Sequence, residues 1–157
     1  MKKKNNPDMN FKSIILTMIL LTGAMGIYGQ TISDSKTLRK AFRAGNNPVL
    51  DVSNKYGNIH ISHTSRDSVT LRVEITATSN NEQRLRGMMS DVEVSLTMTN
   101  ETIRAQTIFG KNVTTLFESF KGLTRNIINF ESRLQINYFI ECPNSTRIRI
   151  TNSYGDV

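Results

Sequence analysis

Cys142, His60 and His63 are side chains of this sequence that could serve as a nucleophile, a base or metal ligands. A catalytic thiol needs a base and an orienting group beside it. Cys142 instead ends an alternating apolar pattern, directly before Pro143, which predicts a packed and inert thiol. His60 and His63 are three positions apart, so in an extended strand they point to opposite faces of the sheet. We therefore expect no catalytic residues, no metal site and no cofactor.

The carboxylates offer another catalytic interpretation, a β-helical enzyme that acts on polysaccharides. Such an enzyme would need several carboxylates converging on one sheet face to hold calcium, with a basic residue as the proton acceptor. The twelve Asp and Glu residues that follow position 29 stand singly on different expected strands and turns. A non-enzymatic protein is therefore the favoured interpretation.

A six-residue pattern, Asn-x-Tyr-Gly-Asx-Ile/Val, occurs twice, at 54–59 and at 152–157. Glycine adopts positive φ without a steric penalty, and Asn or Asp beside it can hydrogen-bond the local backbone. Each copy therefore predicts a sharp corner between two strands, with a tyrosine just before the bend, as repetitive β architectures require at each lap. The residues expected to build the two corners are Asn54, Tyr56, Gly57, Asn58, Asn152, Tyr154, Gly155 and Asp156.

Alternating apolar residues predict most of the remaining strands. The alternation is clearest over 69–77, and it recurs over 134–140 and over 92–98 with 103–109, a pair that we interpret as a hairpin. Residues 80–90 have instead the cap and the apolar spacing of a helix. We expect an all-β fold with mainly antiparallel strands, either a β-sandwich or a β-helix-like stack of sheets, with one short helix near 80–90.

The two ends of the chain define the expected domains. Residues 1–29 combine lysines, a short apolar run and small residues, which predicts a secretory signal peptide. The apolar run is shorter than the roughly 20 residues that a membrane-spanning helix needs. Residues 30–48 are expected to be a linker and 49–157 a β-strand-repeat domain. Because the second corner has only begun its next strand at Val157, we expect this domain to be truncated and the chain to be a fragment of a longer protein.

The signal peptide implies export to the periplasm, the outer membrane surface or the medium. The formal charge is +7 for the whole chain and +4 for residues 30–157, where sixteen basic and twelve acidic side chains remain. A basic exported surface suits an anionic partner such as a surface polysaccharide, but a solvated surface of mixed charge is the favoured interpretation. Arg133, Arg147 and Arg149 could form a basic strip on the wet face of a sheet. Nucleic acid is not an expected partner.

Segment 110–131 is the least regular part of the sequence. Leu116, Phe120, Leu123 and Ile127 have the spacing of one helix face, which could contact a membrane or a partner protein. An insertion that folds its apolar residues over the sheet explains the same spacing. The residues expected to contact a partner are Phe117, Phe120, Lys121 and Arg125.

Asp67-Ser68-Val69 resembles the Asp-Ser/Thr-aliphatic site used for protein O-glycosylation in some Gram-negative envelopes. The residues before Ser68 are a turn cluster, and a turn can tolerate a sugar. Ser68 is therefore a candidate modification site.

Three features together resemble a known family. They are the opening at 52–59, the strand at 136–143 that leads into the second corner, and the export signal. This combination is similar to the adhesin-like family of exported Gram-negative bacterial proteins with β-strand repeats. The resemblance implies an elongated β-helical or stacked-sheet protein that presents a sheet face to glycan or protein, and it supplies no catalytic residues. A periplasmic accessory or regulatory protein that docks another envelope protein is the alternative.

Overall fold

The structure is a computed structural model that describes residues 30–111, 113 and 132–157. The chain divides into two units, Met1–Gln30 and Thr31–Val157. The expected signal peptide lies outside the described residues, as do Phe117, Phe120, Lys121 and Arg125. In the described ranges, no helix has both the length and the apolar character needed to cross a membrane.

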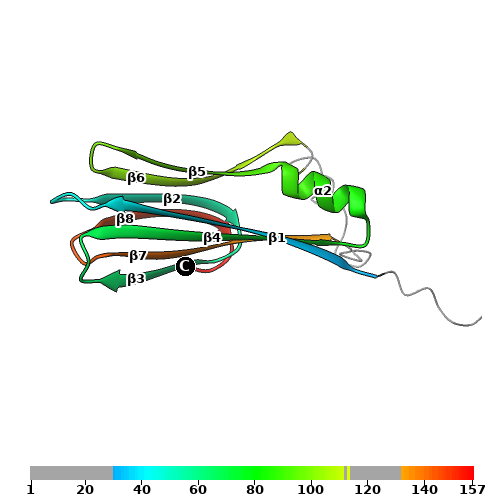
Figure 1. Ribbon diagram of the computed structural model, residues 1–157, viewed down its shortest axis with the longest axis horizontal. Helices are drawn as coiled ribbons and strands as arrows, with labels where there is room; N and C mark the ends of the chain where they lie inside the picture. Colours follow the sequence, from blue (N-terminus) through cyan, green and yellow to red (C-terminus); the bar gives the residue numbers. More distant parts are fainter. Residues whose placement is uncertain (1–29, 112, 114–131) are drawn as a thin grey trace, which may run out of the picture. The chain divides into compact units, whose positions relative to one another are not determined.

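The described part of the second unit forms two four-stranded sheets and one short helix (Figure 1). Sheet A contains, in spatial order, β1 (Ile32–Arg43), β4 (Ser68–Ser79), β7 (Ser132–Pro143) and β3 (Ile59–Thr64). Sheet B contains, in spatial order, β5 (Val92–Thr99), β6 (Thr102–Phe109), β2 (Val49–Tyr56) and β8 (Arg147–Tyr154). The expected all-β fold with one short helix is confirmed.

Both sheets are mixed, because parallel strand pairs accompany the expected antiparallel ones. β4 pairs antiparallel with β1 and β7, and β5 pairs antiparallel with β6. β3 pairs parallel with β7, and β2 pairs parallel with both β6 and β8. The cause is the corner after Tyr56, which carries the chain from β2 in sheet B to β3 in sheet A rather than back along the same sheet. Because the chain leaves sheet B at this corner, the strand that later returns to sheet B beside β2, which is β8, runs parallel to it.

Most of the segment expected to be a linker, 30–48, is a strand, because residues 32–43 form β1, an edge strand of sheet A. β1 pairs with β4 along its whole length, from Ile32 opposite Ser79 to Arg43 opposite Ser68. Most of its side chains are exposed. An edge strand with one neighbour buries few side chains, so its sequence carries little of the alternation by which strands are recognised.

Inward-facing side chains of both sheets form the core. The alternation predicted for 69–77 is observed in β4, where every second residue is buried. A hydrogen bond from Lys40 Nζ on β1 to the Leu96 carbonyl on β5 joins the edges of the two sheets at 2.8 Å. The fully buried large side chains include Leu50, Val52, Ile59, Leu71, Val73, Ile75, Ile103, Ile136, Tyr138 and Ile140.

The predicted helix is α2 (Glu82–Ser90). Asn81 caps it, since its side chain accepts a hydrogen bond from the Arg84 backbone nitrogen at 2.9 Å. Leu85 and Met88 are buried against the sheets, as their spacing predicts. The methionine is thus part of the packing of this end of the molecule.

A polar chain crosses the core between the sheets. The Tyr138 hydroxyl lies 2.6 Å from the Thr107 hydroxyl, which in turn donates to Asn54 Oδ1 at 3.1 Å. Asn54 Nδ2 donates to the Ile136 carbonyl at 2.9 Å. Buried polar atoms are tolerated when each finds such a partner. These hydrogen bonds therefore link β7, β6 and β2 and fix their arrangement.

Tyr138 should make the protein lose stability in strong alkali. Burial raises the pKa of Tyr138 to about 12, with the Thr107 hydrogen bond opposing part of the rise. The unfolded chain ionises this phenol near pH 10, so stability is intact below pH 10 and falls as the pH rises to 12, by about 2 to 3 kcal/mol. Denaturant unfolding at several pH values measures this loss. Tyr138→Phe should remove that part of the pH dependence, and an unchanged dependence in the variant would contradict the assignment.

Candidate functional site

The two predicted corners lie next to each other, because β2 and β8 pair in parallel with Asn54 opposite Asn152 and Tyr56 opposite Tyr154. The two tyrosine rings stack with centroids 5.5 Å apart and planes 7° apart. Gly57 and Gly155 both have positive φ, as the corner chemistry predicts. The corner residues therefore form one continuous structural stack.

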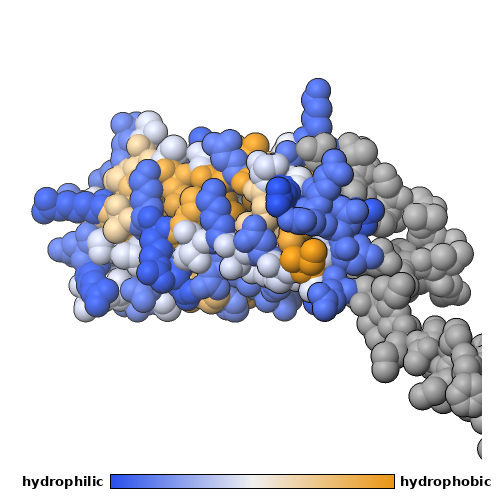
Figure 2. Space-filling view, turned by 45° about the vertical axis from the view of Figure 1, so that its right-hand side comes forward, coloured by the Kyte–Doolittle hydropathy of each residue, from blue (hydrophilic) through white to orange (hydrophobic). Residues whose placement is uncertain are grey.

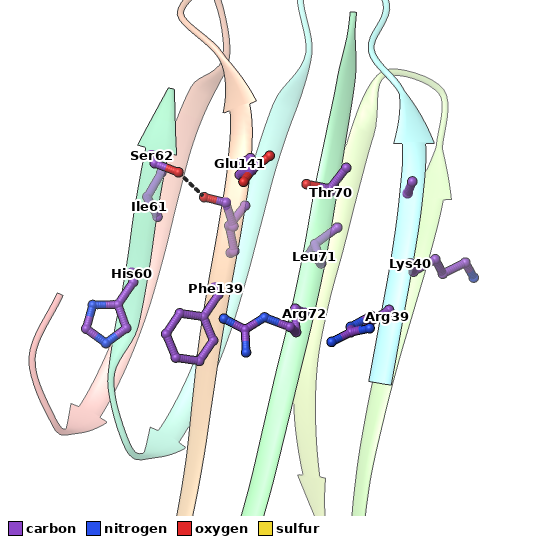
Figure 3. Close-up of a pocket in the computed structure, with 12 residues that line it drawn as sticks. Arg39, Lys40, His60, Ile61, Ser62, Thr70, Leu71, Arg72, Phe139 and Glu141 are labelled. Atoms are coloured by element: carbon purple, nitrogen blue, oxygen red, sulfur yellow. Dashed lines mark hydrogen bonds between the residues drawn. The ribbon is translucent and has the colours of Figure 1, made fainter. Parts of the chain in front are cut away.

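The outer face of sheet A carries a groove of about 600 Å³ that all four strands line (Figure 3). Its floor is a row of four side chains at matching positions on neighbouring strands. In the strand register, Arg39 of β1 lies opposite Arg72 of β4, Arg72 lies opposite Phe139 of β7, and Phe139 lies opposite His60 of β3. Figure 3 shows these side chains side by side across the strands. The row places two cations beside two rings, and we call it the Arg-aromatic row.

The members of the Arg-aromatic row hold one another in place. The Arg72 guanidinium lies 4.0 Å from the centre of the Phe139 ring, and it also pairs with Glu74. The His60 ring stacks on Phe139 at 5.0 Å with an interplanar angle of 17°. Within the part of the chain that the structure describes, Arg39 has no carboxylate partner. Arg39 is therefore the cation of the row that remains available to an anion.

Oxygen-bearing side chains form a second row beside the first. Thr70, Glu141 and Ser62 occupy matching positions on β4, β7 and β3. Ser62 Oγ donates to the Ile140 carbonyl at 3.4 Å, and Glu141 lies 3.7 Å from Arg66. The groove thus offers cations and rings in one row, and hydroxyl and carboxylate hydrogen-bonding groups in the next.

The predicted basic strip does not exist as one surface, because its members lie on different sheets. Arg133 is on β7 of sheet A, whereas Arg147 and Arg149 are on β8 of sheet B. On sheet B, Asp51 lies opposite Arg149 and 3.7 Å from Arg104. The carboxylate between two arginines reduces the positive charge of that face. Strand spacing alone could not reveal this, since it does not say which sheet a strand joins.

The remaining candidate residues are separate from the groove or only border it. Ser68 is the first residue of β4, is half-buried and pairs with Arg43, and its glycosylation stays a prediction. Cys142 is fully buried, and burial raises the pKa of its thiol. Among the described residues, no three His, Cys, Asp or Glu side chains gather where they could hold a metal ion. Most of the visible surface in Figure 2 is hydrophilic, with hydrophobic residues showing between the polar ones.

The Arg-aromatic row was not found from the sequence. Arg72 and His60 each occupy the polar side of an alternating pattern, but the four residues of the row come from four different strands. Only the register of three strand pairs brings them together. The sequence signal that could have suggested the row was an aromatic residue, Phe139, on the polar side of an otherwise clear alternation.

Comparisons with known proteins identify no family for this chain. No protein-family model matches it, and no curated protein matches it. Its structure is similar to part of the crystal structure of a "putative adhesin" from Bacteroides fragilis, with a TM-score of 0.33 and 14% sequence identity. The match covers 78% of this chain and 42% of the other, so the chain spans less than half the length of that protein. A likeness at this level carries no argument about function, and the adhesin-like family stays a prediction.

Proposed function

We propose that this protein is an exported, non-catalytic envelope or surface protein that uses the outer face of sheet A to bind an acidic polysaccharide. The observation that carries the proposal is the Arg-aromatic row, which places Arg39 and Arg72 beside Phe139 and His60 in one groove. The N-terminal sequence supports export, since it has the parts of a signal peptide.

The chemistry of the groove fits a polymer of uronic acids. A guanidinium binds a carboxylate through two parallel hydrogen bonds, and aromatic rings accept the apolar face of a sugar ring. Thr70, Ser62 and Glu141 in the adjacent row can bind sugar hydroxyls. Neighbouring strands are about 4.8 Å apart, so the four-strand row is about 14 Å long. Several consecutive sugars of the polymer would bind along this row, with their carboxylates at the arginines.

The non-catalytic part of the proposal has its own support. The one thiol in the described residues is buried and has a raised pKa, both of which oppose nucleophilic attack. The groove has a single carboxylate, that of Glu141, whereas glycoside hydrolysis ordinarily uses a pair. Binding without turnover is the activity that such a groove can perform.

The test compares acidic and neutral polymers. We expect the purified protein to bind polygalacturonate or alginate, both built from uronic acids, and not dextran, which is neutral. Arg39→Ala should weaken binding about tenfold, because a hydrogen bond to a charged group contributes about 1.5 kcal/mol or more. Isothermal calorimetry or affinity electrophoresis measures the loss.

Arg149→Ala is the matched control, since it removes the same charge from the exposed face of sheet B. It should change binding by less than about twofold if binding is local to the groove. An equal loss of polymer binding in the two variants would mean that binding depends only on the net charge of the protein. Equal binding of dextran would mean that the protein does not recognise the carboxylates. Either result contradicts the proposal.

A further inference from the structure

The outer face of sheet B carries a hollow of about 430 Å³ that three strands line. Val49 of β2 lies at its centre. In the strand register, Val49 is opposite Thr102 of β6 on one side and opposite Arg147 of β8 on the other. The hollow therefore has a half-buried apolar floor, with a hydroxyl on one side of it and a cation on the other.

The next row of the same face holds one carboxylate between two arginines. Asp51 lies opposite both Arg104 of β6 and Arg149 of β8, and it pairs with Arg104 at 3.7 Å. Within the part of the chain that the structure describes, Arg147 and Arg149 have no carboxylate partner. Both are exposed and, being two positions apart, they lie on the same face of β8. These two arginines are the cations of the hollow that remain available to an anion.

The two available arginines can converge on one group above Val49. Neighbouring strands are about 4.8 Å apart, and residues two positions apart on a strand are separated by about 6.7 Å. An extended arginine side chain spans either distance. A phosphate monoester carries about 1.5 to 2 negative charges at pH 7, and guanidinium groups bind it through paired hydrogen bonds. Two converging guanidinium groups match the charge of this dianion, whereas a single carboxylate would neutralise only one of them.

A smaller hollow of about 290 Å³ adjoins the first and extends over β5. Thr102 and Arg104 line both hollows. On β5, Thr97 lies opposite Arg104 and Thr99 lies opposite Thr102, and Asn100 lies in the turn that follows. Hydroxyl and amide side chains both donate and accept hydrogen bonds, as sugar hydroxyl groups require. The second hollow thus offers polar groups to whatever carries the phosphate.

From this geometry we infer that the outer face of sheet B binds a sugar that carries a phosphate monoester. Arg147 and Arg149 bind the phosphate above Val49. The sugar extends over Thr102 toward Thr99, and these threonines hydrogen-bond its hydroxyl groups. Strand pairing uses backbone groups in the plane of a sheet, so the site does not depend on what pairs with the outer edge of β8. The inference is independent of uronate binding, which is proposed for sheet A.

Isothermal calorimetry with the full chain tests the site, with glucose 6-phosphate, inorganic phosphate and glucose as the probes. We expect glucose 6-phosphate to bind about threefold or more tighter than inorganic phosphate, and glucose not to bind. Arg147→Ala and Arg149→Ala should each weaken the binding of glucose 6-phosphate at least about tenfold, because each removes hydrogen bonds between charged groups. Arg39→Ala is the matched control, since it removes the same charge from sheet A and should change this affinity by less than about twofold.

A threonine variant separates recognition of the sugar from recognition of the phosphate. Thr99 is exposed, so we expect Thr99→Val to keep the fold, which circular dichroism can verify. The variant should weaken the binding of glucose 6-phosphate about threefold, because one neutral hydrogen bond is lost. Its affinity for inorganic phosphate should equal that of the wild type.

Four results would overturn the inference. Equal losses in Arg39→Ala and Arg149→Ala would mean that the phosphate responds only to the net charge of the protein. Glucose that binds as tightly as glucose 6-phosphate would mean that the phosphate is not recognised, and equal affinities for glucose 6-phosphate and inorganic phosphate would mean that the sugar is not. Displacement of glucose 6-phosphate by polygalacturonate would mean that carboxylates occupy the same site. Failure of uronate binding to sheet A would change none of these results, so the two proposals can fail separately.

Discussion

Replacing Gly57 with alanine should destabilise the protein by at least about 3 kcal/mol and prevent folding if the native stability is marginal. Gly57 has φ +121°, which side chains rarely allow, and a Cβ there would lie 2.2 Å from the Ile136 carbonyl oxygen. That oxygen belongs to β7, which pairs with β4 at Ile136 and with β3 from Tyr138 onward, and the oxygen also accepts a hydrogen bond from Asn54, so moving it away would break native contacts. Denaturant unfolding followed by circular dichroism measures the loss.

Two other glycines serve as controls for the Gly57 substitution. Gly87→Ala in α2 should stabilise the protein by about 0.5 to 1 kcal/mol, because nothing lies near the new methyl group and alanine favours the helix. Gly155→Ala has a similar clash but belongs to the exposed second corner, so the chain can shift and the loss should be smaller than at Gly57. A Gly57→Ala variant as stable as the wild type would contradict the stacked-corner geometry.

The strands that bury one face were predictable from the sequence, as was the hairpin of β5 with β6, but the other strand partners were not. Alternation in 69–77 and 134–140 reflects burial, which is a property of each strand alone. Pairing depends on where the chain goes after each turn, and the corner after Tyr56 sends it into the other sheet. The strand β1 was missed for a related reason, since a strand at an edge buries too few residues to show a period.

The same limit applies to the candidate site. The corner residues were found because their motif is local, six consecutive positions written twice. The Arg-aromatic row is not local, because Arg39 and Phe139 are a hundred positions apart and meet only through the registers of β1, β4 and β7. A shift of one residue in any of these pairs would turn one member of the row into the core. The row could therefore be recognised only after the pairing was known.

Replacing Asn54 with alanine should destabilise the protein by about 2 to 4 kcal/mol, because the cost of an unmade hydrogen bond is greatest for buried groups. Asn54 is 4% exposed. Its amide nitrogen donates to the Ile136 carbonyl, and its amide oxygen accepts from the Thr107 hydroxyl. The alanine variant removes the hydrogen bonds that Asn54 makes to these two partners inside the core, and it leaves Thr107 only its contact with the Tyr138 hydroxyl. Denaturant unfolding of the variant measures the cost.

Asn152→Ala is the matched control for Asn54, since it removes the same side chain from the second copy of the motif. Asn152 also donates to a corner carbonyl, that of Gly57, but it is half-buried, and its amide oxygen accepts no hydrogen bond from the described residues. Its loss should therefore cost only about 1 kcal/mol. Our explanation is that the first copy contributes more to stability because Asn54 is linked through Thr107 to Tyr138, and not because of the corner hydrogen bond itself. Equal losses of stability in the two variants would contradict this explanation. A double-mutant cycle between Asn54→Ala and Thr107→Val would then measure that link directly, with an expected coupling of about 1 kcal/mol or more.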